Sequence, residues 1–220
     1  MKIDINFVKK LAHDIKGPVG NTVMFSQLLA GQLEKLKEED GSPADAGILH
    51  QQAETILHVN NKLLNQIQCW VFAFELQNGE YEGYTESFKA GEIIDKVVEL
   101  NRIYLDRKEL SLEIDAEREI EITQDKELVY QILDQLVALS ITLQGYGKPM
   151  RITGKWEDGY YRFGIADTYE GNREKIIERF TEAPGDLTEM LPEEGVLKPA
   201  AFGILFCNLA IKYLNGQRGI

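Results

Sequence analysis

Two long stretches of helix-periodic apolar residues, separated by a short polar segment, constrain this chain more than any other feature. Between Ile5 and about Lys37 the apolar residues recur at spacings of three and four, as one face of a helix requires. Residues 38–47 (EEDGSPADAG) are charged and then rich in turn formers, so they interrupt the pattern. A second helical run starts at Ile48 and continues to about Phe74. We therefore predict that the chain opens with an antiparallel hairpin of two helices.

This hairpin has more apolar surface than its two helices can bury against each other. Both helices carry an apolar stripe, and the hairpin cannot bury both stripes by itself. Pairing with a second copy would bury the remainder in a four-helix bundle. We therefore predict a homodimer.

After a polar linker at residues 77–82 (QNGEYE), the pattern changes to short strands mixed with helices. Alternating apolar residues predict strands at 110–116 and around 120–122. Two further strands, 150–156 and 160–166, are predicted to form a hairpin that turns at Glu157-Asp158-Gly159. Helices are predicted at 90–106, 126–143 and 200–214. The fold class is therefore α+β, with a helical hairpin domain at 1–78 and a sandwich domain at 83–220. We expect antiparallel strands with one sheet face covered by helices.

Composition narrows the function classes. The formal net charge of −12 argues against nucleic acid, because phosphate contacts need clustered Lys and Arg. No apolar run reaches the roughly 20 residues that span a bilayer, and no signal peptide opens the chain, so no membrane is expected. Cys69 and Cys207 are predicted to be buried free thiols, which fits the cytoplasm. His13, His50 and His58 lack companions at ligand spacing, so we predict no metal site.

The strongest local signal is the segment HDIKGP, from His13 to Pro18, inside the first predicted helix. A neutral imidazole nitrogen is a good phosphoryl acceptor near neutral pH. Asp14 can accept the other ring proton and orient the nucleophile, and Lys16 offers positive charge to phosphate oxygens. Pro18 removes a helical hydrogen bond and is predicted to bend the helix just after His13.

HDIKGP resembles the H-box of bacterial histidine kinases, in which the histidine carries the phosphoryl group. The second half resembles the ATP-binding lobe of the same family, with its motifs in the same order. The resemblance covers nearly the whole chain and implies that His13 is the phosphoacceptor. The matching segments are the N-box-like helix 125–142, the G1-like segment IADTYEG at 165–171, the F-box-like segment 176–183 and the G2-like segment 200–216.

The chain departs from the family at the positions that would hold nucleotide. Leu139 stands where the family has a magnesium-binding Asn, and Gln135 replaces an earlier Asn. The G1 pattern keeps Asp167, the adenine-binding residue of the family, but Tyr169 replaces its first glycine. A single Gly203 remains where G2 is glycine-rich, and the acidic segment 184–199 would repel a triphosphate. Gly17 also lacks the side chain that positions water in bifunctional kinases.

Three functions remain open, and whether the chain is an enzyme depends on which one holds. We favour a histidine phosphotransferase that relays phosphoryl groups between response regulators through His13, without ATP or another cofactor. The receiver domains would then supply magnesium, and Val19 and Met24 are candidate docking residues or bundle core. The alternatives are an ATP-dependent kinase, with Asp167 on adenine and Asp134 or Gln135 on magnesium, and a module that binds a regulator without chemistry.

Overall fold

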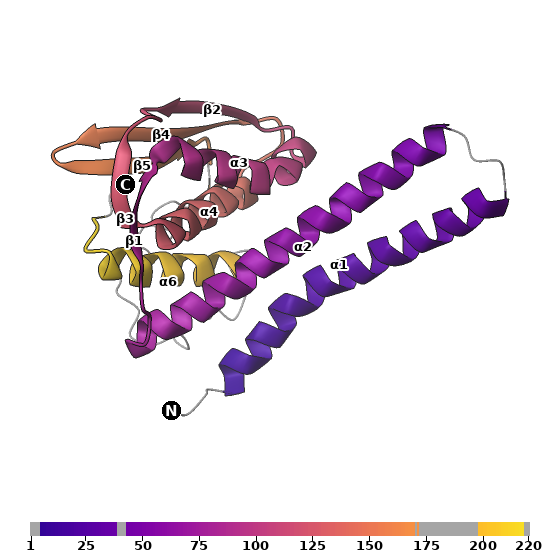
Figure 1. The fold of residues 1–220 in the computed structure, drawn as a ribbon, viewed down its shortest axis with the longest axis horizontal. Coiled ribbons are helices and arrows are strands. Elements are labelled where there is room, and N and C mark those ends of the chain that lie inside the picture. Colours follow the sequence, from indigo (N-terminus) through magenta and orange to yellow (C-terminus); the bar gives the residue numbers. More distant parts are fainter. Residues whose placement is uncertain (1–4, 39–42, 170, 172–197, 218–220) are drawn as a thin grey trace. The chain divides into compact units, whose positions relative to one another are not determined.

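A computed structural model describes residues 5–38, 43–169, 171 and 198–217 of the chain (Figure 1). Their contacts divide the chain into two compact units, Met1–Gln68 and Cys69–Ile220. The first unit contains helix α1 (Ile5–Glu38) and most of α2 (Pro43–Asn78), which confirms the predicted helical hairpin. Helix α2 starts earlier than Ile48, where the sequence pattern places it. Proline is well tolerated in the first turn of a helix, so Pro43 begins α2 rather than lengthening the loop.

The two helices of the hairpin pack along stripes with three- and four-residue spacing. Thr22 and Phe25 are half-buried in α1, whereas their neighbours Val23 and Met24 are exposed. The same alternation of three- and four-residue spacings is found along the helix interface of a coiled coil. The half-buried stripe of α1 comprises Ile15, Pro18, Thr22, Phe25, Leu29 and Gln32, and that of α2 includes Leu49, Gln52, Ile56, Val59, Leu63 and Gln66.

The second unit is an α+β domain built on two small sheets. Strand β1 (Thr85–Lys89) pairs antiparallel with β3 (Glu121–Asp125). In the other sheet β4 (Pro149–Glu157) is central, antiparallel to β5 (Tyr160–Asp167) and parallel to β2 (Ser111–Ala116). The helices are α3 (Ala90–Arg107), α4 (Lys126–Leu143) and α6 (Lys198–Tyr213).

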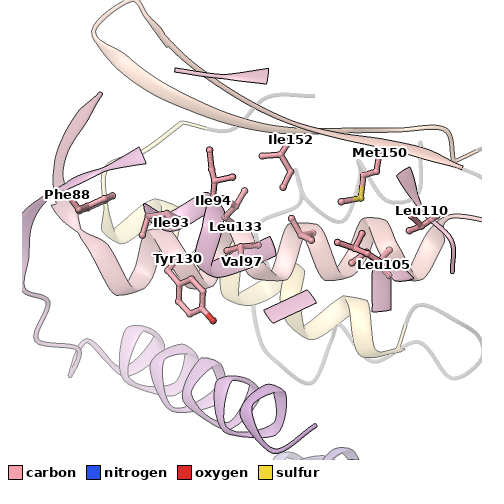
Figure 2. Packing of buried hydrophobic residues seen from close by; sticks show 12 residues of the cluster. Phe88, Ile93, Ile94, Val97, Leu105, Leu110, Tyr130, Leu133, Met150 and Ile152 are labelled. Carbon is pink, nitrogen blue, oxygen red and sulfur yellow. The ribbon is translucent and has the colours of Figure 1, made fainter. Parts of the chain in front are cut away.

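The main core lies between the three-stranded sheet and helices α3 and α4. In Figure 2, Met150 and Ile152 of β4 point from the sheet toward Val97 of α3 and Leu133 of α4. Each of these four side chains is buried. The opposite face of the sheet carries ion pairs instead, including Arg151 with Glu113. The expectation that helices cover one sheet face is therefore confirmed.

A second apolar cluster lies on the other side of α4. Leu128 of α4 packs there with Phe206 and Cys207 of α6 and with Cys69 and Ala73 of α2. The last turns of α2 therefore belong to the α+β domain, although they continue the helix of the hairpin. Both cysteines are buried thiols that form no disulfide, as predicted. Burial raises the pKa of the Cys207 thiol, which keeps it in its protonated form.

Two features of the α+β domain differ from expectation. Strand β1 was not predicted, because Phe88 is its one buried residue and no alternating pattern marks it. The pair of β2 with β4 is parallel rather than antiparallel. Strand β3 and helix α4 lie between these two strands in the sequence, and this long connection lets β4 run in the same direction as β2.

Candidate functional site

The predicted phosphoacceptor segment lies within helix α1. His13, Asp14 and Lys16 all have helical backbone, while the placement of their side chains lies outside the described structure. The helix continues past Pro18 to Glu38, so the proline does not end it. Pro18 has no N–H, and the carbonyl oxygen of Asp14 therefore lacks its usual helical donor. The bend predicted at Pro18 stays a prediction.

One turn beyond Pro18, a threonine joins the two helices of the hairpin. Thr22 Oγ1 lies 3.1 Å from the carbonyl oxygen of Pro18 and 3.1 Å from Oδ1 of Asn60 in α2. The hydroxyl has one proton, so it can donate to either acceptor at a time. This contact fixes α1 against α2 close to the predicted phosphoacceptor segment.

Several apolar side chains of the hairpin stay exposed within the described part of the chain. Val19 and Met24 follow the H-box-like segment and are 41% and 48% exposed. In α2, Leu57 and Leu64 are 61% and 64% exposed and lie seven residues apart, which places them on one face of the helix.

In the α+β domain, Asp167 ends strand β5 and is held by the protein itself. Ser140 Oγ of α4 donates a hydrogen bond of 2.7 Å to Asp167 Oδ2. The backbone N–H of Tyr169 donates one of 3.1 Å to the other oxygen, Oδ1. Both oxygens of the predicted adenine-binding carboxylate are therefore engaged by neighbouring groups.

Tyr169 also fills the space above the remaining glycine of the G1-like segment. A Cβ added at Gly171 would overlap the phenol oxygen of Tyr169. The loss of the first glycine therefore adds a bulky ring beside the second one. In the family pattern these glycines let the backbone approach a nucleotide, and here a side chain of the chain lies against that backbone.

The N-box-like residues of α4 are turned toward other helices. Gln135 lies against α6, where a Cβ added at Gly203 would be 2.7 Å from Gln135 Oε1. Asp134 is fully buried, and its Oδ1 accepts a 2.7 Å hydrogen bond from Asn101 Nδ2 of α3. Leu139 is half-buried and has no oxygen in its side chain. Of the two residues considered as replacement magnesium ligands, Asp134 thus has a partner in α3, and Gln135 lies against α6.

Sequence reasoning missed two residues of this region, Ser140 and Gln144. Gln144 is buried, and its Oε1 accepts a 3.0 Å hydrogen bond from Thr168 Oγ1. Its Nε2 donates to the carbonyl oxygen of Pro149. Together the two side chains tie the end of β5 to α4. Their signal was weak, because polar residues near a helix C-terminus are common in exposed positions.

Several predicted elements lie outside the described residues. These are the F-box-like segment 176–183, residues 184–197 of the acidic segment, and the side chains at 198–202. Among the residues that the structure describes, no group of three or more His, Cys, Asp or Glu gathers as metal ligands. Within the same part of the chain, no helix is long and apolar enough to cross a membrane.

No family model matches the sequence. It is, however, 23% identical over 163 residues to a sensor-like histidine kinase of Rhizobium meliloti, which covers 74% of this chain and 30% of that protein. It is 20% identical over 179 residues to the sensor-like histidine kinase SenX3 of Mycolicibacterium smegmatis, covering 80% of this chain and 44% of that protein. The chain is a distant homologue of sensor histidine kinases. It spans less than half the length of either relative.

Solved histidine kinases are also similar to this histidine-kinase-like chain. Acinetobacter baumannii AdeS is 18% identical, with 87% of this chain and 85% of that chain covered and a TM-score of 0.46. Histidine kinase ThkA, solved in complex with the response regulator protein TrrA, is 16% identical. The match covers 83% of this chain and 51% of the ThkA chain, with a TM-score of 0.44. The similarity to sensor-like histidine kinases confirms the family resemblance inferred from the sequence.

Proposed function

We propose that this chain is a histidine phosphotransferase that relays phosphoryl groups between response regulators, and that it does so without ATP. His13 is the phosphoacceptor in this proposal. The single observation that carries the proposal is the set of contacts around Asp167, because it separates a relay protein from a kinase. The H-box-like sequence is common to both.

The residues at the nucleotide-binding positions do not fit Mg-ATP. The Asp167 carboxylate accepts hydrogen bonds from Ser140 and from the Tyr169 backbone, so an adenine amino group would have to compete with both. The Tyr169 ring lies against Gly171. Leu139 supplies no oxygen ligand to magnesium, and Asp134 is enclosed between helices. These features support a domain that keeps the shape of an ATP lobe for another purpose.

The relay step balances without any nucleotide. Nε2 of neutral His13 attacks the phosphorus of an aspartyl phosphate on the receiver domain of one regulator. The N–P bond forms as the P–O bond to the aspartate breaks, and the aspartate leaves as a carboxylate. A second receiver takes the group from Nε2 by the reverse step. Asp14 would orient the imidazole through Nδ1–H, Lys16 would contact phosphate oxygens, and the receiver would bring magnesium.

The proposal includes a homodimer built on the hairpin. The exposed leucines Leu57 and Leu64 support it, because soluble monomers rarely leave such a row of large apolar side chains uncovered. A second hairpin would cover that row and complete a four-helix bundle.

The test is transfer from a radiolabelled phosphorylated receiver domain to the purified full chain. We expect acid-labile label on the wild-type protein and none on His13→Gln, because glutamine has no nucleophilic ring nitrogen. His50→Gln is the matched control and should take up label like the wild type. Label on His13→Gln would remove His13 from its assigned role.

Incubation of the same proteins with radiolabelled Mg-ATP separates relay from kinase. We expect no label on the wild-type chain. Label that depends on His13 would instead identify an ATP-dependent kinase and overturn our interpretation of the Asp167 contacts. A chain labelled neither by ATP nor by any phosphorylated receiver would favour a module that binds regulators without chemistry.

A further inference from the structure

The short segment between α2 and β1, at residues 79–84, is attached to the α+β domain along its length. The hydroxyl of Tyr81 donates a 3.0 Å hydrogen bond to Asp125 Oδ2. The backbone N–H of Tyr84 donates to the same oxygen, also at 3.0 Å. One carboxylate oxygen therefore holds this segment at two points that are three residues apart.

Asp125 is well placed to act as an anchor. It is 4% exposed, and its other oxygen, Oδ1, accepts a 2.9 Å hydrogen bond from the Leu128 N–H at the start of α4. The same side chain thus caps α4 and holds the segment before β1. Burial, and then the nearby Asp125 charge, raise the pKa of Tyr81, so this phenol stays a donor throughout the physiological pH range.

Tyr213, at the end of α6, also holds the segment. Its hydroxyl oxygen accepts a 3.1 Å hydrogen bond from the Gly83 backbone N–H. The Tyr81 ring packs edge-to-face on Tyr213 and on Phe72 of α2, with centroid separations of 5.1 and 5.2 Å. Such aromatic pairs contribute roughly 0.5–1.5 kcal/mol each beyond their buried area.

The fit around Gly83 is close. A Cβ added there would lie 2.8 Å from Asp125 Oδ2 and 2.8 Å from the Tyr213 hydroxyl oxygen. Any residue other than glycine would therefore push apart the two groups that hold the segment. The sequence of this segment, GEYEGY, is typical of a flexible linker, and its packing makes it part of the domain.

We propose that Tyr81, Asp125 and Tyr213 form a clasp that makes residues 79–84 a fixed connection, so that the last turns of α2 and the α+β domain move as one body. The apolar cluster of Cys69 and Ala73 with Phe206 already joins those turns to α6. With the clasp closed, residues 79–84 do not act as a hinge. This proposal goes beyond phosphoryl transfer, and its test does not depend on whether the chain transfers phosphoryl groups.

Hydrogen–deuterium exchange of the full chain tests the clasp. In the wild-type protein, peptides that cover residues 79–88 should exchange slowly, like the neighbouring α2 and β1. Tyr81→Phe and Tyr213→Phe keep the rings but remove one hydrogen bond each, so exchange at Gly83 and Tyr84 should become roughly three- to tenfold faster. Tyr146→Phe is the matched control, because Tyr146 is 72% exposed in the turn before β4.

A glycine pair gives a second, independent measurement. Gly83→Ala should open the clasp and speed exchange and proteolytic cleavage within 79–84. Gly145→Ala should not, because the nearest atom to its added Cβ is 3.9 Å away. Circular dichroism should be used to check that each variant is folded. Exchange of wild-type residues 79–84 at the rate of an unstructured peptide, or exchange unchanged by Tyr81→Phe and Gly83→Ala alike, would overturn the proposal.

Discussion

Lys108 stabilises the end of a helix to which it does not belong. It follows α3, yet its Nζ donates to the carbonyl oxygens of Ile141, Thr142 and Gln144 at 2.6, 3.1 and 2.9 Å. Ile141 and Thr142 lie in the last turn of α4, where the carbonyls have no helical donor, and Gln144 is its C-cap. A positive charge at this end also interacts favourably with the helix dipole. One ammonium group thus joins the C-terminal ends of α3 and α4.

At the scale of single residues, Lys108→Met should lower the free energy of unfolding by about 1–2 kcal/mol. Methionine keeps the apolar stem but leaves three carbonyl groups without their charged donor. For a chain of this size the melting temperature should fall by roughly 2–8 °C. Lys148→Met is the control, since Lys148 is an exposed lysine that lies a few residues after the end of α4. Equal melting temperatures for the two variants would show that the cap contributes nothing.

Among the elements, the three-stranded sheet depends on a glycine in its central strand. Tyr161 of β5 reaches across Gly154 of β4, and its hydroxyl donates to the carbonyl oxygen of Glu117 after β2 at 3.1 Å. An added Cβ at Gly154 would overlap the tyrosine hydroxyl. The tyrosine therefore connects all three strands, and it can do so because the middle position has no side chain.

Gly154→Ala should destabilise the α+β domain by about 1–3 kcal/mol, because the methyl group displaces the Tyr161 ring. Tyr161→Phe removes the hydroxyl alone and should cost about 0.5–1.5 kcal/mol. Combining the alanine with Tyr161→Leu tests the cause by a double-mutant cycle in urea. If Gly154→Ala costs as much in the Tyr161→Leu background as in the wild type, the ring contact is not the reason.

At the scale of the whole molecule, the hairpin has more apolar surface than a monomer can bury. One stripe of each helix is half-buried against the other helix, and a second row of apolar side chains stays exposed. The homodimer proposed above follows from this surplus of apolar surface.

The double variant Leu57→Glu, Leu64→Glu should therefore be a monomer at micromolar concentration by sedimentation velocity, whereas the wild type sediments as a dimer. Two buried carboxylates per chain would cost several kcal/mol in the bundle interface and little on an exposed surface. Tyr146→Glu, Tyr160→Glu is the matched control, because it adds the same charge at exposed residues of the α+β domain. A wild-type monomer would contradict the dimer outright.

The candidate site was predictable in part. HDIKGP identified His13 as the phosphoacceptor candidate, since a short motif within one helix needs no tertiary information. Asp167 and Tyr169 were also found from the sequence, as a position that matches the family pattern and one that departs from it. The residues that bind this end of β5 were not found from the sequence, because Ser140 and Gln144 contact it only after α4 and β5 have packed.

The sequence by itself determined the helical hairpin, the α+β class, helix α4 and the β4–β5 hairpin, because each depends on local periodicity or on a local turn. Only the tertiary structure decided the parallel pairing of β2 with β4, the existence of β1, and the attachment of residues 79–84 through Asp125. Each of these joins residues far apart in the chain. Local patterns record which face of a segment is apolar, and they do not record which distant segment will cover it.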